Sequence, residues 1–171
     1  MTKRSITLLT TAAALAVLGT TLGPKAAPRF IWNVSESAPT GLYQVRPARR
    51  LIVTAFAVAY PPEPLATFLS DGGYLPHGLP LIKRILALPG QTVCRAGFAI
   101  AVNGIEMGFA RERDRRGRTL PAWQGCRTIS DDEVFLMNRD EPVSLDGRYF
   151  GPIPVSSIVG RAEPLWTSEQ R

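Results

Sequence analysis

The chain has 171 residues, of which 45% are hydrophobic, enough for one domain with a buried core and too few for two large domains. Its formal net charge is +6, but the basic residues are scattered, apart from the run RERDRRGR at 111–118, which also contains acids. Because a mixed charge run with glycine is typical of a solvated loop, the composition does not favour a nucleic-acid partner.

The N-terminal segment has no charged residue from 5 to 24. As a helix rising ~1.5 Å per residue, it would span about 30 Å, the thickness of a bilayer core. Lys3 and Arg4 precede it and favour a cytoplasmic N-terminus. We therefore expect residues 1–29 to be a single-pass membrane anchor and residues 30–171 to be a domain outside the cytoplasm.

A cleavable signal peptide is the alternative for this segment, because it is rich in Thr and Ala and is followed by Ala26 and Ala27. Two observations favour retention. The apolar run is longer than the core of a usual signal peptide, and Phe30, Ile31 and Trp32 follow it as potential interfacial anchors. Under either interpretation the rest of the chain is exported.

Beyond Asn33 the chain consists of short extended runs separated by glycine and proline. The apolar patterns predict strands at 42–45, 51–60, 81–88, 98–102, 133–137 and 155–159. Asn103-Gly104 predicts a two-residue hairpin turn, since both residues tolerate positive φ. Residues 61–70 could form a short helix, and 108–124 has the composition of an exposed insertion. The predicted fold is mainly β, closed or layered so that its edges are protected.

The two cysteines, Cys94 and Cys126, have no metal-site spacing, and the single His77 could not complete such a site. We therefore expect no metal and no cofactor. In an exported domain the cysteines would form a disulfide, and closing that loop would stabilise the fold by ~3 to 4 kcal/mol. Two buried free thiols are the alternative.

Lysine is scarce in this chain, and Lys83 is the one that lies inside an apolar run, LIKRILAL at 81–88. Strand alternation would place Lys83 on the same face as Leu81 and Ile85, towards the core. Burial among aliphatic side chains would lower its pKa and produce a neutral amine that can act as a base. Alternatively, the ammonium extends to solvent or pairs with a carboxylate such as Asp146.

A serine near such a base could be the nucleophile, and the segment SESAPTG at 35–41 offers Ser35 and Ser37. Pro39 and Gly41 predict an irregular loop there, where backbone donors stay unpaired. A Ser-His-Asp triad would need His77, but GGYLPHG around it is turn-like and suggests an exposed imidazole.

Three segments together resemble the type I signal peptidase superfamily, and most closely its TraF-type conjugative-transfer branch. They lie in the order expected for the family and, with the ending GRAEPLW, cover nearly all of 33–166. The segments are NVSESAPTGLY at 33–43, IKRILALPG at 82–90, and NRD at 138–140 leading into SLDGRYFGP at 144–152. The resemblance implies a signal-peptidase-like β-fold catalytic domain.

The resemblance also implies roles for individual residues. Ser37 would be the acylated nucleophile and Lys83 its general base. The hydroxyl of Ser35 would join the backbone N–H of Ser37 in an oxyanion hole, and Ser144 would orient the amine of Lys83. These roles agree with the chemistry, because a neutral amine can take the serine proton and two donors can stabilise the oxyanion.

Asp146 and Arg148 would form a supporting ion pair, according to the same resemblance. The sequence departs from the family pattern at three places. Gly-Asp is missing after Arg50, Ala38 replaces a larger apolar residue, and Gly147 stands where general signal peptidases often have serine. The first departure concerns a turn and the other two concern substrate range.

The implied function is that of a serine endopeptidase in the bacterial inner membrane, with its catalytic domain in the periplasm. Its substrate would be the propilin of a conjugative type IV secretion system, whose product some TraF-type enzymes cyclise, and the secretion apparatus would be a partner. Three alternatives stay open. The chain could be a general leader peptidase, a non-catalytic assembly protein that binds pilin, or a self-cleaving DNA-binding regulator. The apolar N-terminus and the lack of a helix-turn-helix pattern argue against the last.

Overall fold

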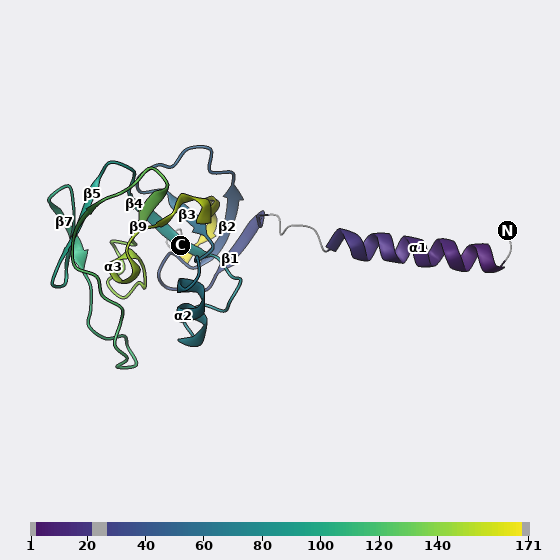
Figure 1. The fold of residues 1–171 in the computed structure, drawn as a ribbon, viewed down its shortest axis with the longest axis horizontal. Helices are drawn as coiled ribbons and strands as arrows, with labels where there is room; N and C mark the ends of the chain where they lie inside the picture. Colours follow the sequence, from purple (N-terminus) through teal and green to yellow (C-terminus); the bar gives the residue numbers. More distant parts are fainter. Residues whose placement is uncertain (1–2, 22–26, 169–171) are drawn as a thin grey trace.

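The computed structural model describes residues 3–21 and 27–168, and its body consists of two antiparallel β-sheets (Figure 1). The larger, curled sheet has the strand order β1-β2-β11-β3-β4-β9-β10. Its strands are β1 (Phe30–Asn33), β2 (Gly41–Arg46), β3 (Phe56–Ala59), β4 (Leu81–Ala87), β9 (Glu133–Leu136), β10 (Ile153–Pro154) and β11 (Ile158–Thr167). The smaller sheet, in the order β7-β6-β5-β8, is built from β5 (Thr92–Ala96), β6 (Ala99–Val102), β7 (Ile105–Phe109) and β8 (Gly125–Thr128). The prediction of a mainly β fold is confirmed.

The helical elements of this body are short: α2 (Leu65–Asp71), α3 (Gly147–Phe150) and the 3-10 turn η1 (Val155–Ser157). The helix expected within 61–70 is therefore present, and it begins after Pro64. The expected hairpin is present as well. Asn103 and Gly104 have φ values of 50° and 79° and connect β6 to β7.

Two predicted strands have different limits in the structure. The run 51–60 is a strand only over β3, because the chain turns before it: Ala55 N–H donates to the Ile52 carbonyl, and Thr54 has a φ of 75°. The run 155–159 begins with η1, and the strand itself, β11, continues to Thr167 between β2 and β3. Strands β1, β5, β7, β8 and β10 were not predicted, because they are short and lack a clear apolar alternation.

The predicted insertion at 108–124 is integrated into the fold. Strand β7 extends to Phe109, and Ala110 and Leu120 are buried in a cluster with Tyr149 of α3. The description as an exposed insertion is therefore wrong for both ends of this segment, because apolar side chains anchor them to the body. The charged residues between those ends are mostly exposed.

The two sheets share a core where β4 and β9 meet β5 and β6. Its members are apolar and almost fully buried: Ala87, Val93, Ile100, Val102, Ile129, Phe135 and Met137. Burial of such side chains contributes roughly 1.5 to 3 kcal/mol each for the larger residues. A second core lies between β2, β3 and β11 and includes Tyr43 and Val58.

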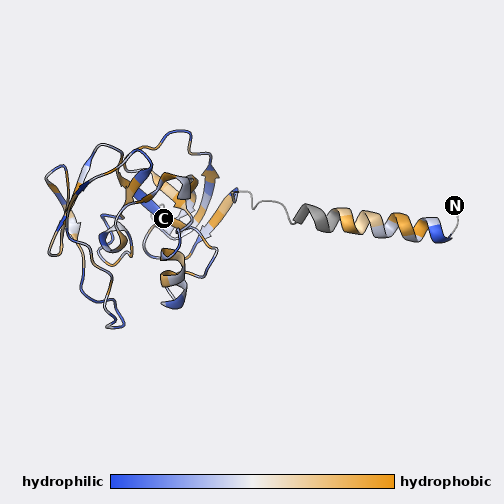
Figure 2. Cartoon of the chain, in the orientation of Figure 1, coloured by the Kyte–Doolittle hydropathy of each residue, from blue (hydrophilic) through white to orange (hydrophobic). Residues whose placement is uncertain are grey.

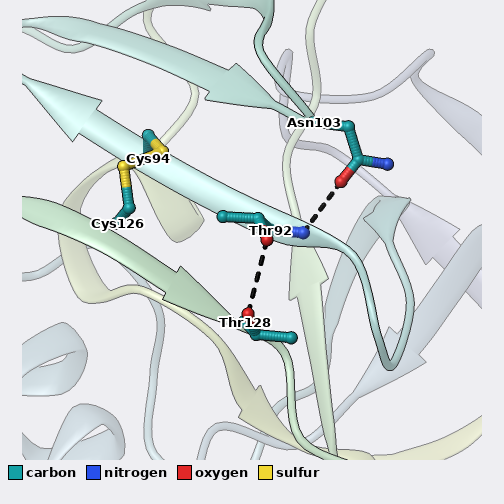
Figure 3. The surroundings of a disulfide bond; sticks show 5 residues. All are labelled: Thr92, Cys94, Asn103, Cys126 and Thr128. Carbon is teal, nitrogen blue, oxygen red and sulfur yellow. Dashed lines mark hydrogen bonds between the residues drawn. A yellow bond between two sulfur atoms is a disulfide. The ribbon is translucent and has the colours of Figure 1, made fainter.

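The cysteines are joined in the smaller sheet, where Cys94 of β5 lies directly opposite Cys126 of β8 (Figure 3). The Thr92 and Thr128 hydroxyls are 3.3 Å apart on the same pair of strands, and Thr92 N–H donates to the Asn103 side chain. The disulfide predicted for an exported domain is therefore formed, and the alternative of free thiols is wrong.

Helix α1 (Lys3–Thr21) precedes the β body (Figure 1). After a hydrophilic first turn, the part of this helix that is coloured by hydropathy is mostly apolar (Figure 2). Across residues 3–21 and 27–168, however, no helix combines the length and the hydropathy that a membrane span needs. The expected transmembrane anchor is thus not confirmed. Ala26, one of the two alanines considered as a cleavage signal, lies outside the described residues.

Candidate active site

The loop that carries Ser35 and Ser37 connects β1 to β2, and Asn33 holds it. The Asn33 side chain is buried, and its Nδ2 lies 2.9 Å from the Ser35 carbonyl, 3.0 Å from the Ala38 carbonyl and 3.1 Å from the Pro39 carbonyl. Its Oδ1 accepts a hydrogen bond from Ser35 N–H. One amide thus satisfies several backbone groups that an irregular loop would otherwise leave unpaired.

The end of this loop is fixed by a close approach between strands. Gly41 has a φ of 140°, and a Cβ at this position would lie 2.1 Å from the Trp166 carbonyl of β11. No other residue fits there without moving the backbone. The Tyr43 hydroxyl, beyond Gly41, donates to the Pro39 carbonyl at 2.7 Å.

Within the loop, the hydroxyls of Ser35 and Ser37 are 2.9 Å apart. Ser37 N–H also donates to the Ser35 hydroxyl, at 3.3 Å. On its other side, the Asn138 side chain donates to the Ser37 carbonyl. Ser37 is partly exposed, so its hydroxyl is held by neighbours and still accessible from solvent.

Lys83 lies on β4, and its side chain is only 3% exposed. Its Nζ donates to the Ser144 hydroxyl at 2.8 Å. Burial lowers the pKa of Lys83 to about 8, because a charged amine loses its hydration; Asp146 opposes this shift and Arg148 adds to it. With that pKa, roughly a tenth of the amine is neutral at pH 7. The alternative that Lys83 extends to solvent is therefore wrong.

Asp146 and Arg148 form an ion pair that is almost completely buried. Arg148 donates from Nε to Asp146 Oδ1 at 2.9 Å and from Nη2 to Oδ2 at 2.8 Å. Arg148 Nη2 also donates to the carbonyls of Asn138 and Glu141, and Asn138 N–H donates to Asp146 Oδ2. This network fixes the segment that carries both Asn138 and Ser144.

Ser37 and Lys83 line one groove, with a volume of about 530 Å³. Ser35 and Ser144 line it as well. Much of its wall is apolar: Ile31, Trp32, Val34, Leu69, Leu75, Leu79, Leu81, Ile82, Val143 and Leu145. Among the described residues, no hydrogen bond joins Ser37 to Lys83. The Ser37 hydroxyl is instead hydrogen-bonded to Ser35, and the Lys83 amine donates to Ser144. Such apo contacts often rearrange when a substrate enters.

The other candidates from the sequence lie elsewhere. His77 is exposed and pairs with Glu63 at 2.9 Å, outside the set of residues that line the groove. The disulfide belongs to the smaller sheet and does not line the groove. Sequence reasoning assigned no role to Asn33 or Asn138. Both lie inside the segments that carry the family resemblance. Asn33 bonds to the loop that directly follows it, whereas Asn138 bonds to Ser37 across 101 positions, which leaves no local pattern.

Comparisons with known proteins identify the family of this chain. The chain belongs to the signal peptidase family, peptidase S26, whose model matches residues 2–166. This family is one of serine peptidases.

Two relatives show which branch of the family the chain is similar to. It is 34% identical to a conjugal transfer protein TraF of Agrobacterium fabrum and 33% identical to a plasmid transfer protein TraF of Escherichia coli. Each match covers 79% of this chain and 81% of the relative. A signal peptidase I from Enterococcus faecalis aligns over 66% of this chain and 97% of its own, with a TM-score of 0.40 at 17% identity.

Proposed function

We propose that this protein is a serine endopeptidase with Ser37 as nucleophile and Lys83 as general base. The observation that supports this most strongly is a buried lysine, Lys83, whose amine has a pKa lowered to about 8 and which lines the same groove as Ser37. Family membership supports the peptidase class, and the groove offers room for a peptide.

In the proposed mechanism, the neutral Nζ of Lys83 takes the proton from the Ser37 hydroxyl as its oxygen attacks the scissile carbonyl. The Ser37 N–H and the Ser35 hydroxyl turn towards the developing oxyanion, and each such donor contributes about 3 kcal/mol. The protonated Lys83 then gives its proton to the leaving amine, which produces an acyl-enzyme on Ser37. Attack by water or by an amine releases the product.

In this scheme Ser144, Asp146 and Arg148 position the reacting groups. The Ser144 hydroxyl accepts from the Lys83 amine and sets its direction. The Asp146–Arg148 pair holds the backbone of the segment that bears Ser144, and it contacts neither Ser37 nor the groove. Asn138 adds a second tie, because it donates to the Ser37 carbonyl and accepts from Arg84 N–H at 2.7 Å.

The proposed substrate is the propilin of a conjugative type IV secretion system. This is supported by the TraF names of two relatives and by the resemblance of 33–43 to the TraF pattern. The acyl-enzyme could then be resolved by water, to give a linear pilin, or by the amino terminus of the pilin itself, to give a cyclic one.

The proposed location is the bacterial inner membrane, with the catalytic domain in the periplasm and the secretion apparatus as a partner. The disulfide supports an oxidising compartment, since such bonds are rare in the cytosol. The uncharged run at 5–24 supports attachment to or transport across the membrane.

Co-expression of the full chain with a candidate propilin, followed by mass spectrometry of the pilin, tests the proposal. We expect a shortened pilin with the native chain and an uncut one with Ser37→Ala. A linear product would reject cyclisation alone. If the propilin stays uncut while secretory leader peptides are removed, the general leader peptidase alternative is correct. If neither is cut and the propilin still binds, the chain is an assembly protein.

A further inference from the structure

Besides the candidate dyad, the groove contains an unusual concentration of arginine. The run RERDRRGR, which the sequence suggested was a solvated loop, contributes Arg111, Arg113, Arg115, Arg116 and Arg118 to the lining. The lining includes only two carboxylates within the described part of the chain, Asp114 and Glu36. The lining of the groove therefore carries a clear excess of positive charge.

Asp114 organises this run, and the groups that it binds offset its negative charge. Its carboxylate accepts from the Tyr74 hydroxyl at 2.7 Å, from Arg118 Nε at 2.7 Å, and from the backbone N–H groups of Arg116 and Arg118. These contacts hold the pKa of Asp114 well below its usual range. Arg118 is also fixed over the Tyr74 ring and donates to the Gly72 carbonyl.

The remaining arginines are less constrained. Arg115 pairs with Glu36 at 3.3 Å. The side chain of Arg115 is 67% exposed and that of Glu36 is 76% exposed. Glu36 directly precedes Ser37, so this contact places the run beside the candidate nucleophile. Among the described residues, the side chains of Arg111 and Arg116 have no hydrogen-bonding or ionic partner, although both line the groove and are exposed.

We propose that the arginines of 111–118 select a peptide substrate that carries acidic residues close to its scissile bond. This inference rests on the proposed peptidase function and specifies its substrate class. Guanidinium groups bind carboxylates through paired hydrogen bonds, and two of them are free to do so here. The exposed Arg115–Glu36 pair is weak enough for a substrate carboxylate to compete for Arg115.

The composition of the groove favours an acidic peptide over a nucleic acid. Much of the rest of its lining is aliphatic, including Leu79, Leu81 and Ile82, which suits the apolar side chains of a peptide. Single-stranded nucleic acid instead prefers a basic groove with aromatic stacking platforms. Of the aromatic residues in this lining, Tyr149 is buried and Tyr74 stacks on Phe68 and lies beneath Arg118, so Trp32 is left as the exposed ring and no row of stacking platforms is present among the described residues.

Peptide binding to the full chain carrying Ser37→Ala tests the inference without turnover. The probes are two fluorescein-labelled, alanine- and valine-rich peptides of about twelve residues, identical except for two central glutamates or two glutamines. We expect the glutamate peptide to bind about tenfold more tightly at low salt, and most of this difference to vanish near 1 M salt, where screening is strong.

The key variant carries Arg111→Gln together with Arg116→Gln. The matched control carries Arg49→Gln together with Arg50→Gln, because these two arginines are also exposed but do not line the groove. We expect the first pair to weaken binding of the glutamate peptide about five- to tenfold and of the glutamine peptide less than twofold. The control pair should change neither.

Equal affinity for the two peptides, or an equal loss in the control pair, would overturn the inference. So would tighter binding of a labelled twelve-nucleotide oligothymidine that depends on Arg111 and Arg116, because the run would then be a nucleic-acid site. The outcome is separate from that of the propilin assay. If neither the propilin nor a secretory leader peptide is cut and the arginine-dependent preference for glutamate persists, the peptidase function fails and the groove still binds acidic peptides.

Discussion

At the scale of single residues, Lys83 is both a requirement for the proposed chemistry and a burden on the fold. The same burial that lowers its pKa to about 8 makes the protonated amine costly in the folded state. Its hydrogen bond to Ser144 offsets part of that cost, while the nearby Asp146 carboxylate is already paired with Arg148. A lysine in such a place is expected where function requires a neutral amine.

The dyad makes a direct prediction about cleavage. Ser37→Ala and Lys83→Ala should each abolish turnover of the propilin and leave the protein folded, as circular dichroism would show. Lys83→Arg should also be inactive, because a guanidinium does not lose its proton at usable pH. His77→Ala is the control, since His77 is exposed, pairs with exposed Glu63 and does not line the groove, and this variant should cleave normally. Substantial turnover by Lys83→Ala would disprove the dyad.

Lys83 also predicts how stability depends on pH. The unfolded chain keeps the lysine proton up to about pH 10.5, whereas the folded chain releases it near pH 8. Between these values the unfolded state binds more protons, so the contribution of Lys83 to stability improves as the pH rises, and its full cost applies below pH 8. Lys83→Met removes that cost.

We therefore expect Lys83→Met to be more stable than the native chain by about 2 kcal/mol at pH 7, after allowing for the lost hydrogen bond to Ser144. This difference in the free energy of unfolding should become smaller towards pH 10. Urea denaturation of both proteins at pH 7 and pH 10 measures the difference. A native chain that is the more stable one at pH 7 would contradict the buried, destabilised amine.

At the scale of elements, the site depends on two irregular segments that regular strands hold in place. Asn33, the last residue of β1, organises the loop before β2, and Asn138 ties that loop to the segment that follows β9. The Asp146–Arg148 pair in turn fixes the backbone of Asn138, because Asp146 accepts from its N–H and Arg148 donates to its carbonyl. Precision at Ser37 thus comes from amide side chains at the ends of strands, which are more rigid than the loops they support.

Asn33→Ala tests this dependence. It removes several hydrogen bonds from the loop, so we expect cleavage to fall more than tenfold while the melting temperature falls by only a few degrees. The matched control is Asn103→Ala, which alters another structurally important asparagine, in the hairpin between β6 and β7 of the smaller sheet. It should lose some stability and cleave normally. Native cleavage by Asn33→Ala would show that loop order is unimportant for activity.

Local patterns predicted these elements with uneven success. The strand that carries Lys83 was predicted almost to the residue, because its aliphatic run is continuous, and the Asn103-Gly104 turn was predicted because both residues tolerate positive φ. The prediction of a strand over the whole run 51–60 was wrong, because an apolar composition does not distinguish a strand from a turn. Strand β8 has no buried residue, so hydrophobic periodicity could not indicate it.

At the scale of the whole molecule, the disulfide links strands β5 and β8 of a sheet that carries neither Ser37 nor Lys83. We expect Cys94→Ser with Cys126→Ser to lower the free energy of unfolding by about 3 kcal/mol, because the unfolded chain gains conformational freedom. Thermal denaturation with and without a reducing agent measures this. Cleavage at a temperature where the variant is still folded should be unchanged.

The reducing agent also provides the control for that measurement. It should lower the stability of the native chain by a similar amount and leave the double variant unaffected. A variant as stable as the native chain would show that the bond contributes nothing to folding. A folded variant without activity would show instead that the smaller sheet influences the groove.

The sequence by itself determined the mainly β class, the resemblance to signal peptidases and the presence of one lysine inside an aliphatic strand, because these are properties of local composition and order. Only the tertiary structure decided which groups meet that lysine: Ser144 is 61 positions away in the chain, and Asn138 reaches Ser37 across 101 positions. It also decided the place of the arginine run, which is solvated as the sequence suggested and also lines the groove, because Ala110 and Leu120 anchor its two ends. Contacts between distant segments depend on how apolar surfaces pack, and no local pattern records that.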